Sequence, residues 1–497
     1  ASAHPHRNIE PLYVDVSANR YWKKAIVCLE GASLSAKGSD AQSVEKLLRY
    51  RYPKGLMDVL DEYASKEITQ DMSSKEKRRI FWERKAFQLT HEDGQTLQDH
   101  PKIVQTIKLI KEILKNHPNE KILIFGTYND PLKALNNALN AEYFVDRLEK
   151  GLILQNDISK NLQLQDEYYK TYKKIFPVGS YSLNKASFVG RAIELHNKYE
   201  NLQERLRTLM DKENLVDILD FQKERTQTKK IDFSFEKIRK SNESLYKNII
   251  EQIRKDVLNK LLDEEKIVLL ENRDYIMQLC REMAQMYLRD IKEANADGTS
   301  IDDDEITDKD IENYLKNEEE SAMLSRFSRF MHGDTKWDTR RRVQRMFNTA
   351  NSMPKILIAQ SLVGREGLNL HKCCRHVILF HPEWNPGVVE QEIGRVDRIE
   401  SLWNKLALEW IEKNKANPNT EQFPLINVYY IIFQGTYDQH QFNVLESRSK
   451  QMNAQLFGTL LENSAFEKVP EELKEELVKA APNFDPCKKD DKKVCVK

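Results

Sequence analysis

Several features are absent from this sequence, and each absence excludes a class of protein. The 497 residues contain no apolar run near the about eighteen residues that a membrane span needs. The six cysteines form no CxxC pair, which argues against a disulfide framework or a structural zinc site. The start, ASAHPHRN, lacks the apolar segment of a secretory signal. We therefore expect a cytoplasmic chain with reduced thiols, no membrane segment and no metal site of its own.

The sequence also lacks the two patterns by which many proteins hold ATP and magnesium. We recognise neither a GxxxxGK[ST] phosphate loop nor a DExx magnesium site. The nearest approximation, Gly179 to Lys185, has no second glycine, and no Ser or Thr follows its lysine. The chain alone is therefore expected to hydrolyse no ATP.

The bulk composition is that of a helix-rich protein of several structural units. The residues are 40% hydrophobic and 31% charged, and 78 basic side chains balance 78 acidic ones. A length of 497 residues favours two to four units over a single core. A net charge of zero allows nucleic-acid binding where basic residues gather on one face, because phosphate affinity follows local charge.

The most informative stretch is KILIAQSLVGREGLNLHKCCRHVILFHPEWNPGVVEQEIGRVDRI, from Lys355 to Ile399. Its apolar runs at 356–359 and 376–380 predict strands buried on both faces of a parallel sheet. Polar loops follow both strands, and open α/β sheets bind ligands at the carboxyl ends of their strands. The pattern predicts a ligand site in this stretch.

Two arginines close the stretch. Arg395 and Arg398 are three residues apart, so on a helix they would share a face. Two guanidiniums on one face fit a polyphosphate, because each planar fork pairs with two phosphate oxygens. The alternative is a pair of surface arginines in ion pairs with Glu392 or Glu400.

The order GREGLNL, WNP and QEIGRVDRI resembles motifs V and VI of superfamily 2 helicases, and WNP resembles the SWI/SNF-related branch. The sequence HPEWNPGVVEQEIGRVDR is similar to that of bacterial RapA-like proteins, including DISARM-type antiviral defence helicases. The resemblance implies a RecA-like C-terminal motor lobe that acts on ATP and double-stranded DNA. It implies that Arg395 and Arg398 are catalytic arginine fingers. The residues that it implies near the nucleotide are Gly364, Glu366, Gly367, Gln391 and Gly394.

Two further segments resemble the same family. KILIFGTYND is similar to the motif IV strand and loop, and RFMHGDTKWDTRRRVQRMFN occupies the place of the next strand and helix. The residues that the resemblance implies at the nucleic acid are Thr127, Tyr128, His332, Gly333, Thr335, Arg365, Asn369, Trp384 and Asn385. In this family a first lobe holds the magnesium ion, so a first lobe from the same protein or another chain is an expected partner. The abrupt start suggests a C-terminal piece of a longer protein.

The predicted fold is a RecA-like α/β doubly wound parallel sheet with an all-α insertion and a helical N-terminal connector. The predicted parts are a connector at 1–98, the lobe at 99–140 plus 326–462, a helical bundle or coiled coil at 141–325, and a short helix with a disordered tail at 463–497. The insertion is a candidate surface for protein partners. The alternative function is a non-catalytic interaction protein built on a degenerate lobe, whereas WNP disfavours an RNA helicase.

Overall fold

The computed structural model describes part of the chain. Among its helices, none is long and apolar enough to cross a membrane. The described residues are 6–14, 24, 27–28, 31, 68–69, 71–90, 101–153, 162–175, 185–211, 239–240, 242–263, 266–295, 326–350, 352–361, 368–416, 422–457, 470 and 473.

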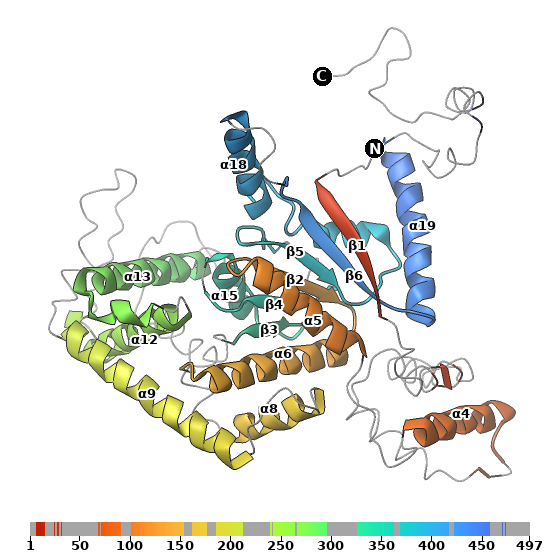
Figure 1. The fold of residues 1–497 in the computed structure, drawn as a ribbon, viewed down its shortest axis with the longest axis horizontal. Coiled ribbons are helices and arrows are strands. Elements are labelled where there is room, and N and C mark those ends of the chain that lie inside the picture. The colour runs from red at the N-terminus through yellow and green to blue at the C-terminus, as the bar shows by residue number, and fades with distance from the viewer. Residues whose placement is uncertain are drawn as a thin grey trace, which may run out of the picture. The chain divides into compact units, whose positions relative to one another are not determined.

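Six strands form one parallel sheet in the order β1-β6-β5-β2-β4-β3 (Figure 1). The non-consecutive order is that of a sheet built by crossover connections, most of which contain helices. The predicted α/β fold is thereby confirmed. The strands are β1 Arg7–Val14, β2 Lys121–Gly126, β3 Ser328–Met331, β4 Ile356–Gln360, β5 Cys374–Leu379 and β6 Ile426–Phe433.

The inner strands follow the apolar runs of the sequence. Every residue of β2 and β5 is buried, and β4 is buried except at its last residue, Gln360. Strands covered on both faces need apolar side chains in both directions, which gives continuous runs rather than alternation. Strands β4 and β5 lie where the sequence predicted them, and β2 lies where the resemblance implied a strand.

Strand β1 is an element of the N-terminal segment that the predicted helical connector did not include. Residues Arg7–Val14 pair in parallel with β6, from Arg7 opposite Ile426 to Val14 opposite Phe433. Most of its residues are exposed or half-buried, so the strand has no apolar run to reveal it. Pro11 fits this position, because proline is tolerated on edge strands, where one side of the backbone has no partner. Its pairing with β6, rather than local sequence, makes the segment a strand.

The chain divides into two compact units, which are described separately. The first comprises residues 1–115, 122–132 and 359–497. Its helix α5, Pro101–Asn116, buries Ile103, Ile107 and Ile110 at helical spacing. Its other helices are α4 Ser74–Thr90, α17 Pro386–Ile393, α18 Leu402–Ala416 and α19 Tyr437–Phe457. Helix α19 packs on β6 and α17 (Figure 1).

The second unit comprises residues 116–121 and 133–358 and contains two apolar clusters of its own. One joins three helices through contacts of the Phe144 ring with those of Tyr168 and Phe188. The other lies among α9, α12 and α13. The helices are α6 Asn129–Lys150, α8 Leu162–Ile175, α9 Lys185–Asp211, α12 Glu243–Asp263, η4 Ile267–Glu271, α13 Arg273–Asn295 and α15 Trp337–Asn348.

These helices account for the described elements of 141–325. The start of the insertion, predicted after residue 140, falls inside the continuous helix α6. Its buried residues Phe144 and Leu148 extend the apolar face of the helix past that point. The predicted tail at 463–497 lies outside the described residues, apart from 470 and 473.

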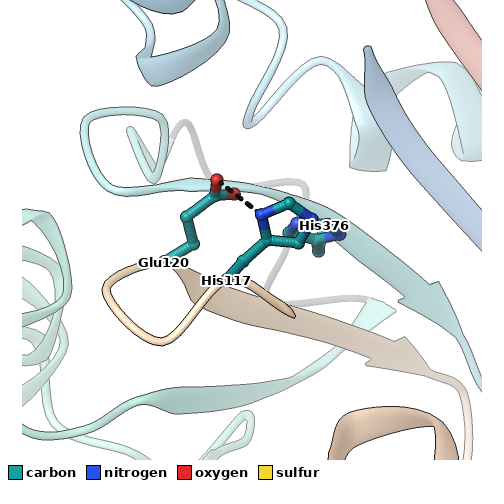
Figure 2. Close-up of side chains that lie close together, drawn as sticks. All are labelled: His117, Glu120 and His376. Atoms are coloured by element: carbon teal, nitrogen blue, oxygen red, sulfur yellow. Dashed lines mark ion pairs between the residues drawn. The ribbon is translucent and has the colours of Figure 1, made fainter. Parts of the chain in front are cut away.

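A short turn leads from α5 into β2. The backbone N–H of Glu120 donates to the carbonyl of His117 across 3.1 Å. The two side chains also approach, with Nδ1 of His117 3.5 Å from a carboxylate oxygen of Glu120 (Figure 2). These two contacts fix the start of β2, whose far end carries the loop at Thr127.

Candidate functional site

The two arginines lie in a turn directly after α17, not on the helix itself. The side chain of Asn385 caps the helix by accepting from the N–H of Gly387, and Pro386 takes the first helical position. The helix ends at Ile393. The N–H of Gly394 then bonds to the Glu390 carbonyl across 2.8 Å, and tight turns continue to residue 400. The expectation of a shared helical face is therefore corrected to a shared turn, which we call the arginine turn (394–398).

Arg395 is a buried cation on which the nearby charge of Glu392 acts without a direct ion pair. Its side chain makes no hydrogen bond and no ion pair within the described residues, and its Nε is buried without an acceptor. The residue is only 8% exposed. Arg398 is half-buried, and its Nε donates to the Gly394 carbonyl across 3.0 Å. The alternative of surface arginines bridging Glu392 or Glu400 does not fit this geometry.

The electrostatics of the arginine turn disfavour its positive charge. Burial lowers the pKa of Arg395, the nearby charge of Arg398 lowers it further, and Glu392 opposes these effects. Burial likewise lowers the pKa of His371, and Arg398 and Lys372 add to the effect. Like charges that are held close in a desolvated place are stabilised by an added anion. The arginine turn is thus suited to an oxyanion ligand.

The polypeptide after the GREGLNL stretch supports the arginine turn from one side. The N–H of Leu370 donates to the Arg395 carbonyl across 3.2 Å. The N–H of Leu402 donates to the His371 carbonyl across 2.8 Å. Residues 370 and 371 therefore connect the arginine turn to the start of α18.

The N-terminal strand supports the arginine turn from another side, which the sequence did not indicate. Arg7 donates through Nε and Nη2 to Oδ2 of Asp397, at 2.8 and 2.7 Å. Its Nη1 reaches Glu390 of α17 at 2.6 Å. The His6 ring bonds the same Asp397 oxygen at 2.8 Å and lies 4.6 Å from the ring of Trp403. No short-range pattern links residues 390 positions apart.

A second polar group lies at the carboxyl ends of β2 and β5. The N–H of Thr127 donates to Nδ1 of His381 across 3.1 Å, and its hydroxyl donates to Glu383 across 3.0 Å. The Tyr128 ring contacts the His381 ring edge-on at 5.2 Å. Because Nδ1 of His381 accepts a hydrogen bond, its proton is on Nε2. Thr127 and Tyr128, predicted near nucleic acid, are thus joined to His381 and Glu383, which the prediction missed.

Helix α19 holds the loop that contains Trp384. Arg448 donates to the Trp384 carbonyl across 2.8 Å and lies 5.9 Å from the centre of its ring. Tyr437 contacts the same ring edge-on. Gln441 donates to the Pro382 carbonyl across 2.8 Å. The neighbouring Asn385, also predicted near nucleic acid, serves as the helix cap.

In the second unit, Arg340 of α15 organises the loop that follows β3. It donates to the carbonyls of Thr335 at 2.8 Å and Gly333 at 2.5 Å. The Thr335 hydroxyl accepts from the N–H of His332 across 3.0 Å. The three predicted residues of this loop are therefore held in one compact turn.

The remaining predicted residues divide into two groups. Asn369 and Gln391 are exposed, and Gly394 ends α17. A Cβ at Gly394 would lie 3.0 Å from the Glu390 carbonyl, so a side chain there would disturb the arginine turn. Gly364, Arg365, Glu366 and Gly367 lie outside the described residues.

Comparison with known proteins gives one family match in this region. Residues 305–400 match the model of the helicase conserved C-terminal domain. This stretch of the chain is therefore similar to the C-terminal domain of helicases. The matched range includes Arg395, Arg398 and the loop after β3.

The other comparisons add little. No curated protein matches the chain. Among solved structures, the "Crystal structure of the C-terminal part of Fun30 ATPase domain" covers 55% of this chain and 91% of its own, at 13% identity and a TM-score of 0.18. A score this low carries no argument about function.

Proposed function

We propose that this chain supplies the second motor lobe of an ATP-dependent double-stranded DNA translocase. Arg395 carries the proposal, because it is a buried guanidinium beside a second arginine, and its side chain makes no hydrogen bond or ion pair in the described part of the chain. Burying a cation is costly unless it is paired. A site that bears this cost without a partner is explained by a ligand that provides the missing charge.

A triphosphate fits the chemistry of the arginine turn. The γ-phosphoryl group carries charge on three oxygens during transfer, and guanidiniums stabilise that charge. Arg395 and Arg398 would bind the phosphate together with Gln391 and Gly394, and we propose that Gly364, Glu366 and Gly367 contribute as well. ATP supplies the phosphoryl group and the free energy of its hydrolysis. The first lobe would provide the phosphate loop and would hold the magnesium ion that accompanies ATP.

The nucleic-acid part of the proposal rests on the loops at the carboxyl ends of the strands. Hydrogen bonds within the chain hold Thr127, Trp384 and Asn385, so these loops have defined shapes before a ligand arrives. Their short polar groups suit contacts to the DNA backbone, which position a duplex without reading its sequence. We also propose contacts to the DNA backbone from Tyr128, Arg365 and Asn369 and, in the second unit, from His332, Gly333 and Thr335.

The narrower assignment is to the SWI/SNF-related, RapA-like branch in the bacterial cytoplasm. The support for this assignment is the sequence HPEWNPGVVEQEIGRVDR, which contains the WNP motif. Antiviral defence is the pathway that we propose within this branch. Partner proteins would bind the helical insertion.

ATP hydrolysis by the chain joined to its first lobe tests the proposal. Replacing Arg398 by alanine should lower DNA-stimulated hydrolysis by about 10³, the scale of an arginine finger. Affinity for duplex DNA should stay nearly unchanged. The matched control is Arg205→Ala on α9, an exposed arginine of the second unit. Hydrolysis by the Arg398 variant within tenfold of wild type would contradict the proposal and favour a non-catalytic interaction protein.

A further inference from the structure

The side chain of Arg7 joins two acidic residues on either side of the arginine turn. It bonds Glu390 in the last turn and a half of α17 and Asp397 between the two arginines. The Arg7 side chain is 7% exposed, whereas Asp397 and Glu390 are 16% and 35% exposed. Arg7 is therefore a buried cation fully engaged by two carboxylates, which is the reverse of the situation of Arg395.

The guanidinium of Arg7 attracts the two carboxylates and also restricts their orientation. A guanidinium is planar, and its donors leave in fixed directions, so contacts to two carboxylates restrict the position of each one. One side of the fork holds the helix and the other holds the turn that follows it. The geometry between α17 and Asp397 is thereby fixed from outside the segment.

The side chains of the two arginines need such a fixed point because their own contacts are few. Within the described residues the Arg395 side chain has no hydrogen bond, and that of Arg398 bonds only the Gly394 carbonyl. The repulsion between these two cations tends to separate them. Asp397 lies between them in sequence, so holding Asp397 limits the movement of both.

We propose that Arg7 of β1 is a positioning residue for the phosphate-binding arginines, acting through Asp397 and Glu390. This inference rests on the proposed function of the arginine turn. Strand β1 is itself placed by eight parallel residue pairs with β6. His6 completes the contact, because it bonds Asp397 and packs against Trp403 at the start of α18. The N-terminal strand thus serves the phosphate site without touching phosphate.

The test compares three variants of the full chain. Arg7→Leu removes the contact, and Arg7→Lys keeps the charge but lacks the fork. Asn8→Ala is the matched control, because Asn8 is the next residue of β1 and bonds Asn427 of β6 instead of the arginine turn. Asp397→Asn approaches the same contact from its other end, should the leucine variant fail to fold.

The readout is the rate at which phenylglyoxal modifies Arg395 and Arg398, measured by peptide mass spectrometry. The exposed Arg207 of α9 provides the internal reference. Losing charge-assisted hydrogen bonds should raise the rate at Arg395 by about tenfold in Arg7→Leu and in Asp397→Asn. The rise should be smaller in Arg7→Lys and absent in Asn8→Ala. An equal rise in Asn8→Ala, or a change below twofold in Arg7→Leu and Asp397→Asn, would overturn the inference.

Inorganic pyrophosphate separates this inference from the proposed function. Pyrophosphate should slow modification of both arginines in the wild type, and Arg7→Leu should need about tenfold more of it for the same protection. If pyrophosphate gives no protection in the wild type, the phosphate site is wrong, although the basal rates still report on Arg7. If pyrophosphate protects the wild type and Arg7→Leu equally, the phosphate site stands and the positioning role of Arg7 is wrong.

Discussion

Lys102 and Asp438 form an ion pair that is buried on both sides, with Nζ 2.5 Å from Oδ2 and side-chain exposures of 0% and 2%. The pair joins the first turn of α5 to the first turn of α19. The same Asp438 oxygen accepts from the backbone N–H of Phe433 across 3.3 Å, at the end of β6. Burial lowers the pKa of Lys102, because its charged form loses hydration there.

Replacing Lys102 by methionine should lower the free energy of unfolding by about 3 to 5 kcal/mol, because Asp438 is left buried without its cation. The double variant Lys102→Met with Asp438→Asn should cost less than the lysine variant alone. Urea unfolding followed by circular dichroism measures both. Lys108→Met on the exposed face of α5 is the control. Additive losses would show that the two side chains stabilise the fold independently.

Replacing Arg395 by methionine should raise the free energy of unfolding by about 1 to 2 kcal/mol when no nucleotide is present, because a buried cation without a partner is removed. The gain would identify Arg395 as a residue kept for binding rather than for stability. Urea unfolding without nucleotide tests it. Arg7→Met should change stability in the opposite direction, since Arg7 is paired. A loss in the Arg395 variant would mean that another acceptor offsets its burial.

Replacing Asp397 by asparagine should destabilise the protein in a pH-dependent way. Burial alone would raise the pKa of Asp397, but hydrogen bonds from His6 and Arg7 outweigh it, so the pKa lies below the ordinary 3.8. The stabilisation by Asp397 is therefore complete above pH 3.8 and is lost as pH falls through the lowered pKa. Near pH 7 the variant should lose about 1.5 to 3 kcal/mol.

Melting temperatures of wild type and variant between pH 7 and about pH 3 measure this difference. The difference should shrink at the acid end. Asp146→Asn, which breaks an exposed pair with Lys150, should have little effect at any pH. A difference that stays constant through the acid range would assign the loss to packing rather than to charge.

Replacing Gly126 by alanine should destabilise the loop after β2 by about 1 to 3 kcal/mol. The added Cβ would lie 2.6 Å from Nδ1 of His381 and 2.8 Å from a methyl carbon of Leu132. Movement of the His381 ring would break its hydrogen bond with Thr127. Gly190→Ala in α9 is the matched control, because open space surrounds that position and alanine favours a helix. Equal stability of both variants in thermal melts would contradict this account.

Local sequence predicted the elements whose buried faces can be recognised from the pattern of their own apolar residues. Strands β2, β4 and β5 are covered on both faces and therefore contain continuous apolar runs. Helix α5 likewise shows its buried face in its own residues, because Ile103, Ile107 and Ile110 repeat at helical spacing. The α/β sheet could be predicted from these elements.

Long-range contacts were not predictable in the same way. Strand β1 lacks an apolar run, since its place depends on β6. The role of Arg7 depends on Asp397, and nothing in either neighbourhood indicates the other. The end of α17 before the arginines was also missed, because Gly394 at that point keeps a right-handed conformation and continues the pattern. The roles of the arginines and loops remain predictions.

The pairing of β1 with β6 has a consequence for how the lobe is made. Residues 8 and 427 lie 419 positions apart, so this edge of the sheet closes only after most of the chain has left the ribosome. Contacts of such long separation form late in folding, because a large loop must close first. Arg7 can thus reach Asp397 only near the end of folding. A chain that stops short of β6 would keep the inner strands while its arginine turn lacks an anchor.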